Sequence, residues 1–209
     1  MAAEVEDGVA VELWARDGAL EIVRAGRTVL ASDQRHAEQA FAELTTAPWV
    51  GRDDITVLLD GLGFGGTLRA VLDRPGVVRV DVVEPSAAVV AWQPRFATIS
   101  GDAAADPRVQ IHTTSFAALL LRPRVPDLPA DGWFVVLTVD PALQDDDGLR
   151  RIEGALRGGG VVGTLTAGKD DALLKRMSAR FQAVTRVGVA GDAGLEYVYR
   201  GRRIPKRAS

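Results

Sequence analysis

The sequence contains no cysteine, which excludes disulfide bonds, thiolate nucleophiles and cysteine-ligated metals. Its two histidines lie far apart with no acids spaced around them as metal ligands, so we expect no metal site. No apolar run reaches the roughly 18 to 20 residues that a membrane span needs. The first residues also lack the basic start and apolar stretch of a signal peptide. These absences favour a cytoplasmic protein with no membrane partner.

Positive charge is not in excess either. The chain has 25 Lys and Arg against 28 Asp and Glu, a net charge of −3, so no basic field attracts a phosphate backbone. The basic run RGRRIPKR lies near the C-terminal end, where a solvated tail is the simpler interpretation. We therefore expect no nucleic-acid partner, and the negative balance suits a small cationic substrate.

The 209 residues favour one domain with a small appendage. Three short runs near the start, VAVELWA, LEIVRA and TVLA, are separated by turns at Asp17-Gly18 and Gly26, which predicts a small antiparallel β-meander. The segment SDQRHAEQAFAEL then combines two N-cap residues with apolar residues at helical spacing. We expect a meander over residues 1–31 and a main domain over residues 32–209.

The main domain alternates apolar runs with helical segments. The runs are ITVLLD, VVRVDVVE, RVQIHT, WFVVLTVD and GVVGTLTA. Strands without polar alternation are buried on both faces, and the alternation with helices predicts right-handed crossovers in a parallel sheet. The segments AVTRVGVA and LEYVYRGRR flank the turn GDAG and predict a C-terminal β-hairpin that adds an antiparallel edge strand.

A glycine-rich loop follows the first strand of the main domain. Gly61, Gly63 and Gly66 fit the spacing G-x-G-x-x-G, with Gly65 in addition. Such glycines let the backbone turn sharply off a strand and let a ligand approach, while the next helix presents free N–H groups. The second strand ends in Glu84, where a ribose-binding carboxylate is expected. The alternatives are a tight strand–helix turn for the loop and a solvated strand end for Glu84.

Glycine-rich loops of this kind occur both in dinucleotide-binding sites and in adenosyl-sulfonium-binding sites. The terminal hairpin distinguishes them by analogy of fold, because a reversed seventh strand is typical of the methyltransferase-type, Rossmann-like sheet and unusual in nicotinamide domains. We therefore expect a doubly wound, mostly parallel α/β sheet of the methyltransferase type. Such a protein should bind adenosyl sulfonium compounds or thioethers and not NAD.

The stretch from Val57 to Val90 resembles the core of the spermidine synthases, the polyamine aminopropyltransferases of the class I S-adenosylmethionine-dependent methyltransferase-like superfamily. The residues that match the family pattern are Gly61, Gly63, Gly65, Gly66, Thr67, Leu68, Arg69 and Glu84. The resemblance implies that the glycines and Glu84 bind S-adenosylmethionine or decarboxylated S-adenosylmethionine as co-substrate, with no metal. WFVVLTVD is similar to the family's fourth strand, which implies that Asp140 is the catalytic aspartate.

Three acids of the family pattern are replaced in this chain. Phe64 stands for the acid inside the glycine loop, Leu143 for the second acid of an Asp-x-x-Asp pair, and Ser115 for the acid that contacts the adenine amine. Ser115 still offers one weaker hydrogen bond to the nucleoside. A diamine between Phe64 and Leu143 would face apolar groups, and a buried ammonium without a partner is costly. We therefore expect weak or absent aminopropyl transfer to putrescine.

Acidic residues at other positions are candidates for the roles of the three replaced acids. Asp60, at the tip of the first strand, either faces the ligand as a catalytic group or bonds backbone N–H groups of its own loop. The run from Asp145 to Asp147 either supplies acids near Asp140 or is an exposed start of a helix. Asp140 either orients and deprotonates the acceptor or caps the turn that follows. Because ligands lie beyond the carboxyl ends of parallel strands, we expect Asp60, Glu84 and Asp140 to share one cleft.

The expected function is alkyl transfer, aminopropyl by resemblance, from an adenosyl sulfonium nucleoside to a small-molecule amine. Two alternatives stay open. One is an S-adenosylmethionine-dependent methyltransferase, and the other is a degenerate relative that catalyses nothing. The sequence identifies neither the acceptor nor the oligomeric state, and a homodimer is left open.

Overall fold

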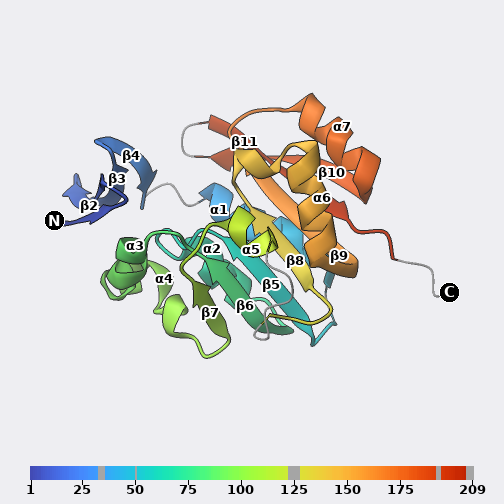
Figure 1. Ribbon diagram of the computed structural model, residues 1–209, viewed down its shortest axis with the longest axis horizontal. Helices are drawn as coiled ribbons and strands as arrows, with labels where there is room; N and C mark the ends of the chain where they lie inside the picture. The colour runs from blue at the N-terminus through green and yellow to red at the C-terminus, as the bar shows by residue number, and fades with distance from the viewer. Residues whose placement is uncertain (33–35, 50, 122–127, 192–193, 206–209) are drawn as a thin grey trace.

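The computed structural model describes residues 1–32, 36–49, 51–121, 128–191 and 194–205. Within these ranges the chain forms a four-stranded sheet and a seven-stranded sheet. Figure 1 shows the smaller sheet at one end of the molecule, beside α3. None of the helices in these ranges combines the length and the apolar character that crossing a membrane requires.

The small sheet is an antiparallel meander, as predicted. Its strands are β1 (Ala2–Glu6), β2 (Val9–Arg16), β3 (Ala19–Arg24) and β4 (Arg27–Ala31), paired in chain order. The predicted turns contain Gly18 and Gly26, both with positive φ. The sequence prediction missed β1, because none of its residues is buried and no apolar alternation marks it.

The large sheet is doubly wound, mostly parallel and of the predicted methyltransferase type. Its strands are β5 (Ile55–Asp60), β6 (Val77–Val83), β7 (Val109–His112), β8 (Trp133–Thr138), β9 (Leu156–Thr166), β10 (Gln182–Gly191) and β11 (Gly194–Arg202). They lie in the order β10-β11-β9-β8-β5-β6-β7, and only β11 runs against its neighbours.

The C-terminal hairpin differs from the prediction in one respect. The antiparallel strand β11 is not at the edge but lies between β9 and β10. The reason is burial: β11 carries the fully buried Val198 and Tyr199, whereas most residues of β10 are exposed or half-buried. The more apolar strand is therefore inside the sheet, and β10 forms the edge.

Helices cover both faces of this sheet. They are α1 (His36–Thr46), α2 (Gly66–Leu72), α3 (Ala87–Trp92), α4 (Ala97–Ser100), α5 (Phe116–Leu121), α6 (Asp146–Ala155) and α7 (Asp171–Arg180). Short 3-10 turns complete the chain: η1 (Ala47–Trp49), η2 (Gln93–Phe96), η3 (Ala103–Ala105) and η4 (Pro141–Leu143). Residues of α1, α2 and α3 pack with Val57 and Leu59 in a first core, and residues of α5, α6 and α7 pack with Leu58 in a second core. The alternation along β5 thus fills both cores.

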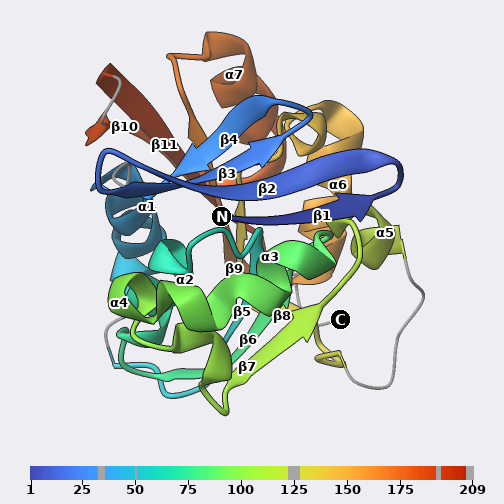
Figure 2. The same ribbon diagram turned by 90° about the vertical axis from the view of Figure 1, so that its left-hand side faces the viewer.

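The meander packs against the main domain at the carboxyl ends of the parallel strands of the large sheet. Leu13 and Ile22 belong to the first core, and Glu6 Oε1 accepts a 2.9 Å hydrogen bond from Ala88 N at the start of α3. Figure 2 shows the meander lying above α3. This contact places the small sheet beside the strand ends at which the predicted site residues stand.

Candidate active site

Two adjoining cavities lie between the meander and the carboxyl ends of the parallel strands. One, the Asp60 cavity, has a volume of about 310 Å³, and the other, the Glu84 cavity, about 220 Å³. Leu30, Gly61 and Gly63 line both. The glycine loop therefore forms the boundary between two cavities whose other lining residues differ.

The glycines of this loop have different physical reasons to be glycine. Gly61 has a φ of 83°, and a Cβ atom there would meet no protein atom within 4 Å, so its backbone faces open space where a ligand can approach. A Cβ on Gly63 would lie 2.7 Å from Leu30, and one on Gly65 would lie 2.7 Å from Ser100 Cβ. Gly66 begins α2. Gly61 thus leaves room for the predicted ligand contact, which stays a prediction, whereas Gly63 and Gly65 allow close packing.

Glu84 is not a solvated strand end, because its side chain is only 7% exposed. Its Oε2 accepts a hydrogen bond from Leu62 N at 3.0 Å, and its Oε1 accepts one from Ser86 N at 2.9 Å. The carboxylate therefore joins the glycine loop to the segment after β6. A carboxylate has about four acceptor sites, so acceptor capacity is left for ribose hydroxyls in the cavity that Glu84 lines. Ribose binding by Glu84 stays a prediction.

Asp60 lines the cavity named after it, and its carboxyl group also accepts backbone hydrogen bonds from Val139 and Asp140, in the segment after β8. Its Oδ2 accepts a 2.6 Å hydrogen bond from the hydroxyl of Thr138, on the neighbouring strand β8. Burial raises the pKa of Asp60 to about 6; the Thr138 bond opposes this rise, and the charge of Asp140 adds to it. The carboxyl group is thus suited to exchange a proton near neutral pH.

Asp140 caps the turn that follows it, which was the second of its two predicted roles. Its Oδ1 accepts a 2.8 Å hydrogen bond from Ala142 N, and its own N–H is bonded to Thr138 Oγ1 at 3.2 Å. Asp140 lines neither cavity, but its charge acts on Asp60. The three predicted acids therefore stand at one edge of the sheet, with Asp60 and Glu84 in adjoining cavities. Contact of Asp140 with an acceptor stays a prediction.

The expectation that Phe64 and Leu143 would flank an acceptor is wrong. Phe64 is buried in the first core, edge-on to Phe96 with the ring centroids 4.9 Å apart, and Leu143 is buried in the second core. Ser115 is exposed and its Oγ accepts a hydrogen bond from Ala118 N, so it caps α5 and lines neither cavity. The residues that replace the family's acids therefore do not form an apolar pair on either side of a ligand. A nucleoside contact by Ser115 stays a prediction.

The acidic run from Asp145 to Asp147 lies at the start of the helix α6, which is one of the two alternatives predicted from the sequence. Asp145 Oδ1 accepts a 2.7 Å hydrogen bond from Gly148 N. Asp147 forms ion pairs with Arg150 and Arg151. Neither carboxylate lines the Asp60 cavity or the Glu84 cavity.

The cavities also contain charged residues beyond Asp60 and Glu84. Glu38 of α1 and Glu196 of β11 line the Asp60 cavity, and Arg24 of β3 lines the Glu84 cavity. Because β11 runs against the parallel strands, its first residues lie beside the carboxyl end of β9, where Tyr197 pairs with Thr166. The described residues contain no grouping of three histidines, cysteines or acids that would hold a metal ion.

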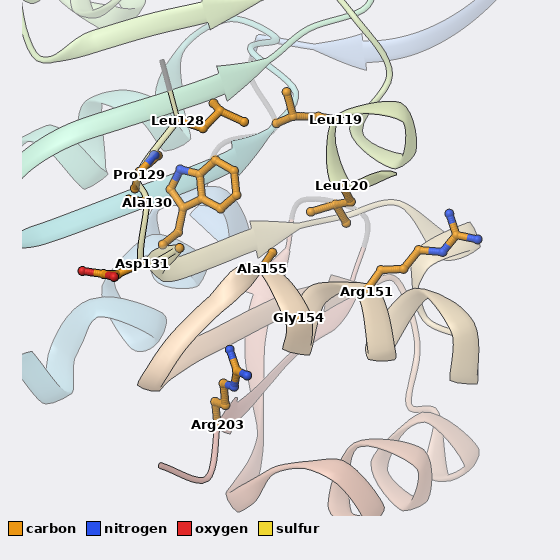
Figure 3. Close-up of a pocket in the computed structure, with 12 residues that line it drawn as sticks. Leu119, Leu120, Leu128, Pro129, Ala130, Asp131, Arg151, Gly154, Ala155 and Arg203 are labelled. Atoms are coloured by element: carbon orange, nitrogen blue, oxygen red, sulfur yellow. The ribbon is translucent and has the colours of Figure 1, made fainter. Parts of the chain in front are cut away.

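A larger cavity, of about 540 Å³, lies elsewhere. Trp133, the first residue of β8, lines it together with Arg151, Arg203 and several leucines (Figure 3). It therefore lies at the amino end of a parallel strand, opposite to the edge where sheets of this type bind ligands. We place the candidate site at the glycine loop instead.

Comparisons with known proteins support the fold alone. No family model matches the chain, and no curated protein matches it. Among solved structures, a spermidine synthase in complex with the transition state analogue AdoDATO and a spermidine synthase from Thermotoga maritima each give a TM-score of 0.77 at 17% identity, over 99% of this chain and 73% of theirs. A probable spermidine synthase from Corynebacterium glutamicum gives 0.67 at 15% identity, over 96% of this chain and 79% of that one.

Proposed function

We propose that this protein binds an adenosyl sulfonium nucleoside and transfers its alkyl group, aminopropyl in the first instance, to a small-molecule amine. The observation that carries the proposal is the pairing of two cavities across the glycine loop. The buried Glu84 borders one of them, and the other contains Asp60, Glu38 and Glu196. The spermidine synthase fold, one example of which holds a transition state analogue, supports the same reading.

The nucleoside fits the Glu84 cavity on physical grounds. Gly61 leaves its backbone open to a ligand, and Glu84 is buried and already fixed by two backbone hydrogen bonds. A carboxylate held in this way offers its remaining lone pairs to the two ribose hydroxyls without further ordering cost. The reacting carbon beside the sulfonium would then point across Gly61 and Gly63 toward Asp60.

The Asp60 cavity provides what the acceptor needs. An amine is mostly protonated at neutral pH and must lose a proton before or as its nitrogen attacks. The nitrogen forms a bond to the carbon beside the sulfonium, the carbon–sulfur bond breaks, and the electron pair stays on the neutral thioether. Asp60 takes the proton that the amine loses. Asp140 acts through Asp60, because its charge raises the pKa of that carboxyl.

Transfer to putrescine is therefore expected to occur, in contrast to the expectation from the sequence. That expectation assumed an ammonium group between Phe64 and Leu143, and both side chains are buried in separate cores. An ammonium group in the Asp60 cavity instead faces the carboxyl group of Asp60. A buried cation with a charged hydrogen-bond partner avoids the desolvation cost on which the earlier argument depended.

Methyl transfer from intact S-adenosylmethionine is a second candidate, favoured by one observation. Arg24 lines the Glu84 cavity, and a guanidinium group binds carboxylates through two parallel hydrogen bonds. The methionyl carboxylate of S-adenosylmethionine would suit that group, whereas the decarboxylated compound offers it nothing. A preference for the carboxylated nucleoside would therefore favour methyl transfer.

Calorimetric titration tests the nucleoside part of the proposal. We expect S-adenosylmethionine, its decarboxylated form or methylthioadenosine to bind, and NAD to give no heat of binding. Glu84→Ala should weaken nucleoside binding by roughly 1.5–3 kcal/mol, because hydrogen bonds to a charged group are lost. The matched control is Glu43→Ala, an exposed acid on α1 that lines neither cavity.

Thermal unfolding of both variants guards against a simple loss of fold, since Glu84 also fixes the glycine loop. Binding of NAD together with indifference to every adenosyl sulfur compound would refute the proposal. Equal affinities of the wild type and Glu84→Ala would remove Glu84 from the ribose site.

A further inference from the structure

We infer that Gln93, in the 3-10 turn η2, is a positioning residue: its side-chain amide fixes the glycine loop in the conformation that binds the nucleoside. The inference rests on the proposed function and deepens it, because it names a residue that shapes the nucleoside site from behind. Gln93 is not among the positions that match the spermidine synthase pattern. It acts through Gly63 and not on the ligand itself.

The side chain of Gln93 connects η2 to the glycine loop over a separation of 30 residues in the sequence. It is only 6% exposed. Its Nε2 donates hydrogen bonds to Gly63 O at 2.9 Å and to Val89 O at 3.1 Å. Because both partners are carbonyl groups, the amide nitrogen is the atom that must face them. Both N–H groups of the amide are thus used, one on α3 and one on the glycine loop.

The oxygen of the same amide is not used in this way. Within the described part of the chain, Gln93 Oε1 is buried and no donor is bonded to it. A buried acceptor without a partner costs free energy that an apolar side chain of the same length would avoid. Stability of the fold is therefore a weak reason for a glutamine here. The hydrogen bond to Gly63 O is the contact that an apolar side chain cannot make.

The segment that contains Gln93 packs against the loop at neighbouring points. Phe96 of η2 lies edge-on to the ring of Phe64. Ser100 of α4 lies against Gly65: a Cβ atom on Gly65 would come 2.7 Å from Ser100 Cβ and 3.5 Å from Gln93 Oε1. The absence of a side chain at Gly65 therefore leaves room for the amide. Three successive residues of the loop are thus in contact with this one segment.

Gln93 and Glu84 hold adjacent residues of the loop. Glu84 accepts a hydrogen bond from Leu62 N, and Gln93 donates one to Gly63 O. Gly63 has a φ of 48° and the wide conformational freedom of glycine, so the partner of its carbonyl group decides how this peptide is oriented. In a trans peptide the C=O and N–H point in opposite directions, so the same bond also orients the N–H of Phe64. Because Gly63 lines both cavities, a rotation of this peptide would alter the wall between them.

The test removes the amide and keeps the volume of the side chain. Gln93→Met has the same length and no donor, and Gln93→Leu repeats the test with a stiffer apolar side chain. Gln144→Met is the matched control. Gln144 is a second buried glutamine, 9% exposed, whose Nε2 donates to Thr164 Oγ1 at 3.1 Å and which lines neither cavity. Methylthioadenosine and S-adenosylmethionine are titrated calorimetrically into the wild type and each variant, and thermal unfolding is measured in parallel.

We expect both Gln93 variants to bind the nucleoside about three- to tenfold more weakly, the factor that one neutral hydrogen bond supplies. Their thermal stability should be no lower than that of Gln144→Met, which should bind the nucleoside as the wild type does. Under turnover, KM for the nucleoside should rise in the Gln93 variants, while kcat and KM for putrescine stay near the wild-type values. A general loss of structure would not change one constant alone.

Unchanged nucleoside affinity in Gln93→Met or Gln93→Leu would overturn the inference. An equal loss of affinity in Gln144→Met would also overturn it, because the effect would then belong to any buried glutamine. Failure of the proposed function has a different signature: the wild type itself would bind neither nucleoside, and the inference would fall with it.

Discussion

Replacing Asp60 with asparagine is expected to slow amine transfer by about 10²–10⁴-fold, the contribution of a positioned general base. Asparagine keeps the shape and the hydrogen bond to Thr138 but cannot take a proton. Nucleoside affinity should stay within a few-fold of the wild type, because Asp60 lines the neighbouring cavity and not the one that contains Glu84. The measurement is the initial rate of transfer at saturating nucleoside.

The pH dependence of the wild-type rate gives an independent check. Asp60 accepts a proton only when it is ionised, and its pKa is about 6. The rate should therefore fall as the pH drops through about 6. Asp140→Asn removes the like charge that helps to raise this pKa, so the acid limb should move to lower pH. Loss of transfer at every pH in Asp140→Asn would instead mean that Asp140 contacts the acceptor, and full activity of Asp60→Asn would exclude Asp60 as the base.

The second large effect concerns stability and a cluster that the sequence did not reveal. Asp81 on β6 is fully buried and accepts hydrogen bonds from Arg79 Nε at 2.8 Å, His112 Nε2 at 2.8 Å and Trp133 Nε1 at 2.8 Å. Burial opposes ionisation of this carboxyl group, but the bonds from Arg79, His112 and Trp133 outweigh it and hold its pKa below the ordinary value. The cluster thus contains a buried charge that depends on its partners.

Asp81→Asn is expected to destabilise the protein by about 3–5 kcal/mol, the cost of breaking a buried ion pair by removing one partner. Chemical denaturation measures this loss. Because the pKa of Asp81 is lower in the folded state, its contribution is present above the ordinary value of 3.8 and is lost as the pH falls further. The control is Asp73→Asn, whose exposed pair with Arg69 should contribute less than about 1 kcal/mol. Equal losses in the free energy of unfolding for the two substitutions would show that the buried cluster stabilises the fold no more than an exposed ion pair does.

Much of the fold follows from the sequence because buried parallel strands leave a strong pattern. The run ITVLLD coincides with β5, and WFVVLTVD contains β8, whose residues are all buried. The last two residues of that run leave the strand because Asp140 precedes Pro141 and caps the next turn. The exposed strand β1 and the position of β11 inside the sheet were missed, because one has no apolar pattern and the other depends on which strand of the hairpin is buried.

The site was less accessible to sequence reasoning than the fold. Glu84 and Asp60 were predicted as site residues because strand ends mark them, and each lines a cavity. The burial of Phe64 was not foreseen, since loop residues have no fixed alternation that tells which side chain turns inward. Thr138 and Glu196 lie at the site only because of strand pairing. Thr138, for example, is 78 residues away from Asp60 in the sequence. Long-range contacts of this kind leave no local signal.

Product analysis tests the central claim, alkyl transfer to an amine, most directly. The protein is incubated with putrescine and, in separate reactions, with decarboxylated S-adenosylmethionine or S-adenosylmethionine, and the products are identified by mass spectrometry. We predict putrescine extended by one aminopropyl group, together with an equal amount of methylthioadenosine. A methylated amine formed only from S-adenosylmethionine would support the second candidate. Consumption of neither nucleoside, at concentrations where calorimetry shows both nucleoside and amine bound, would contradict the account.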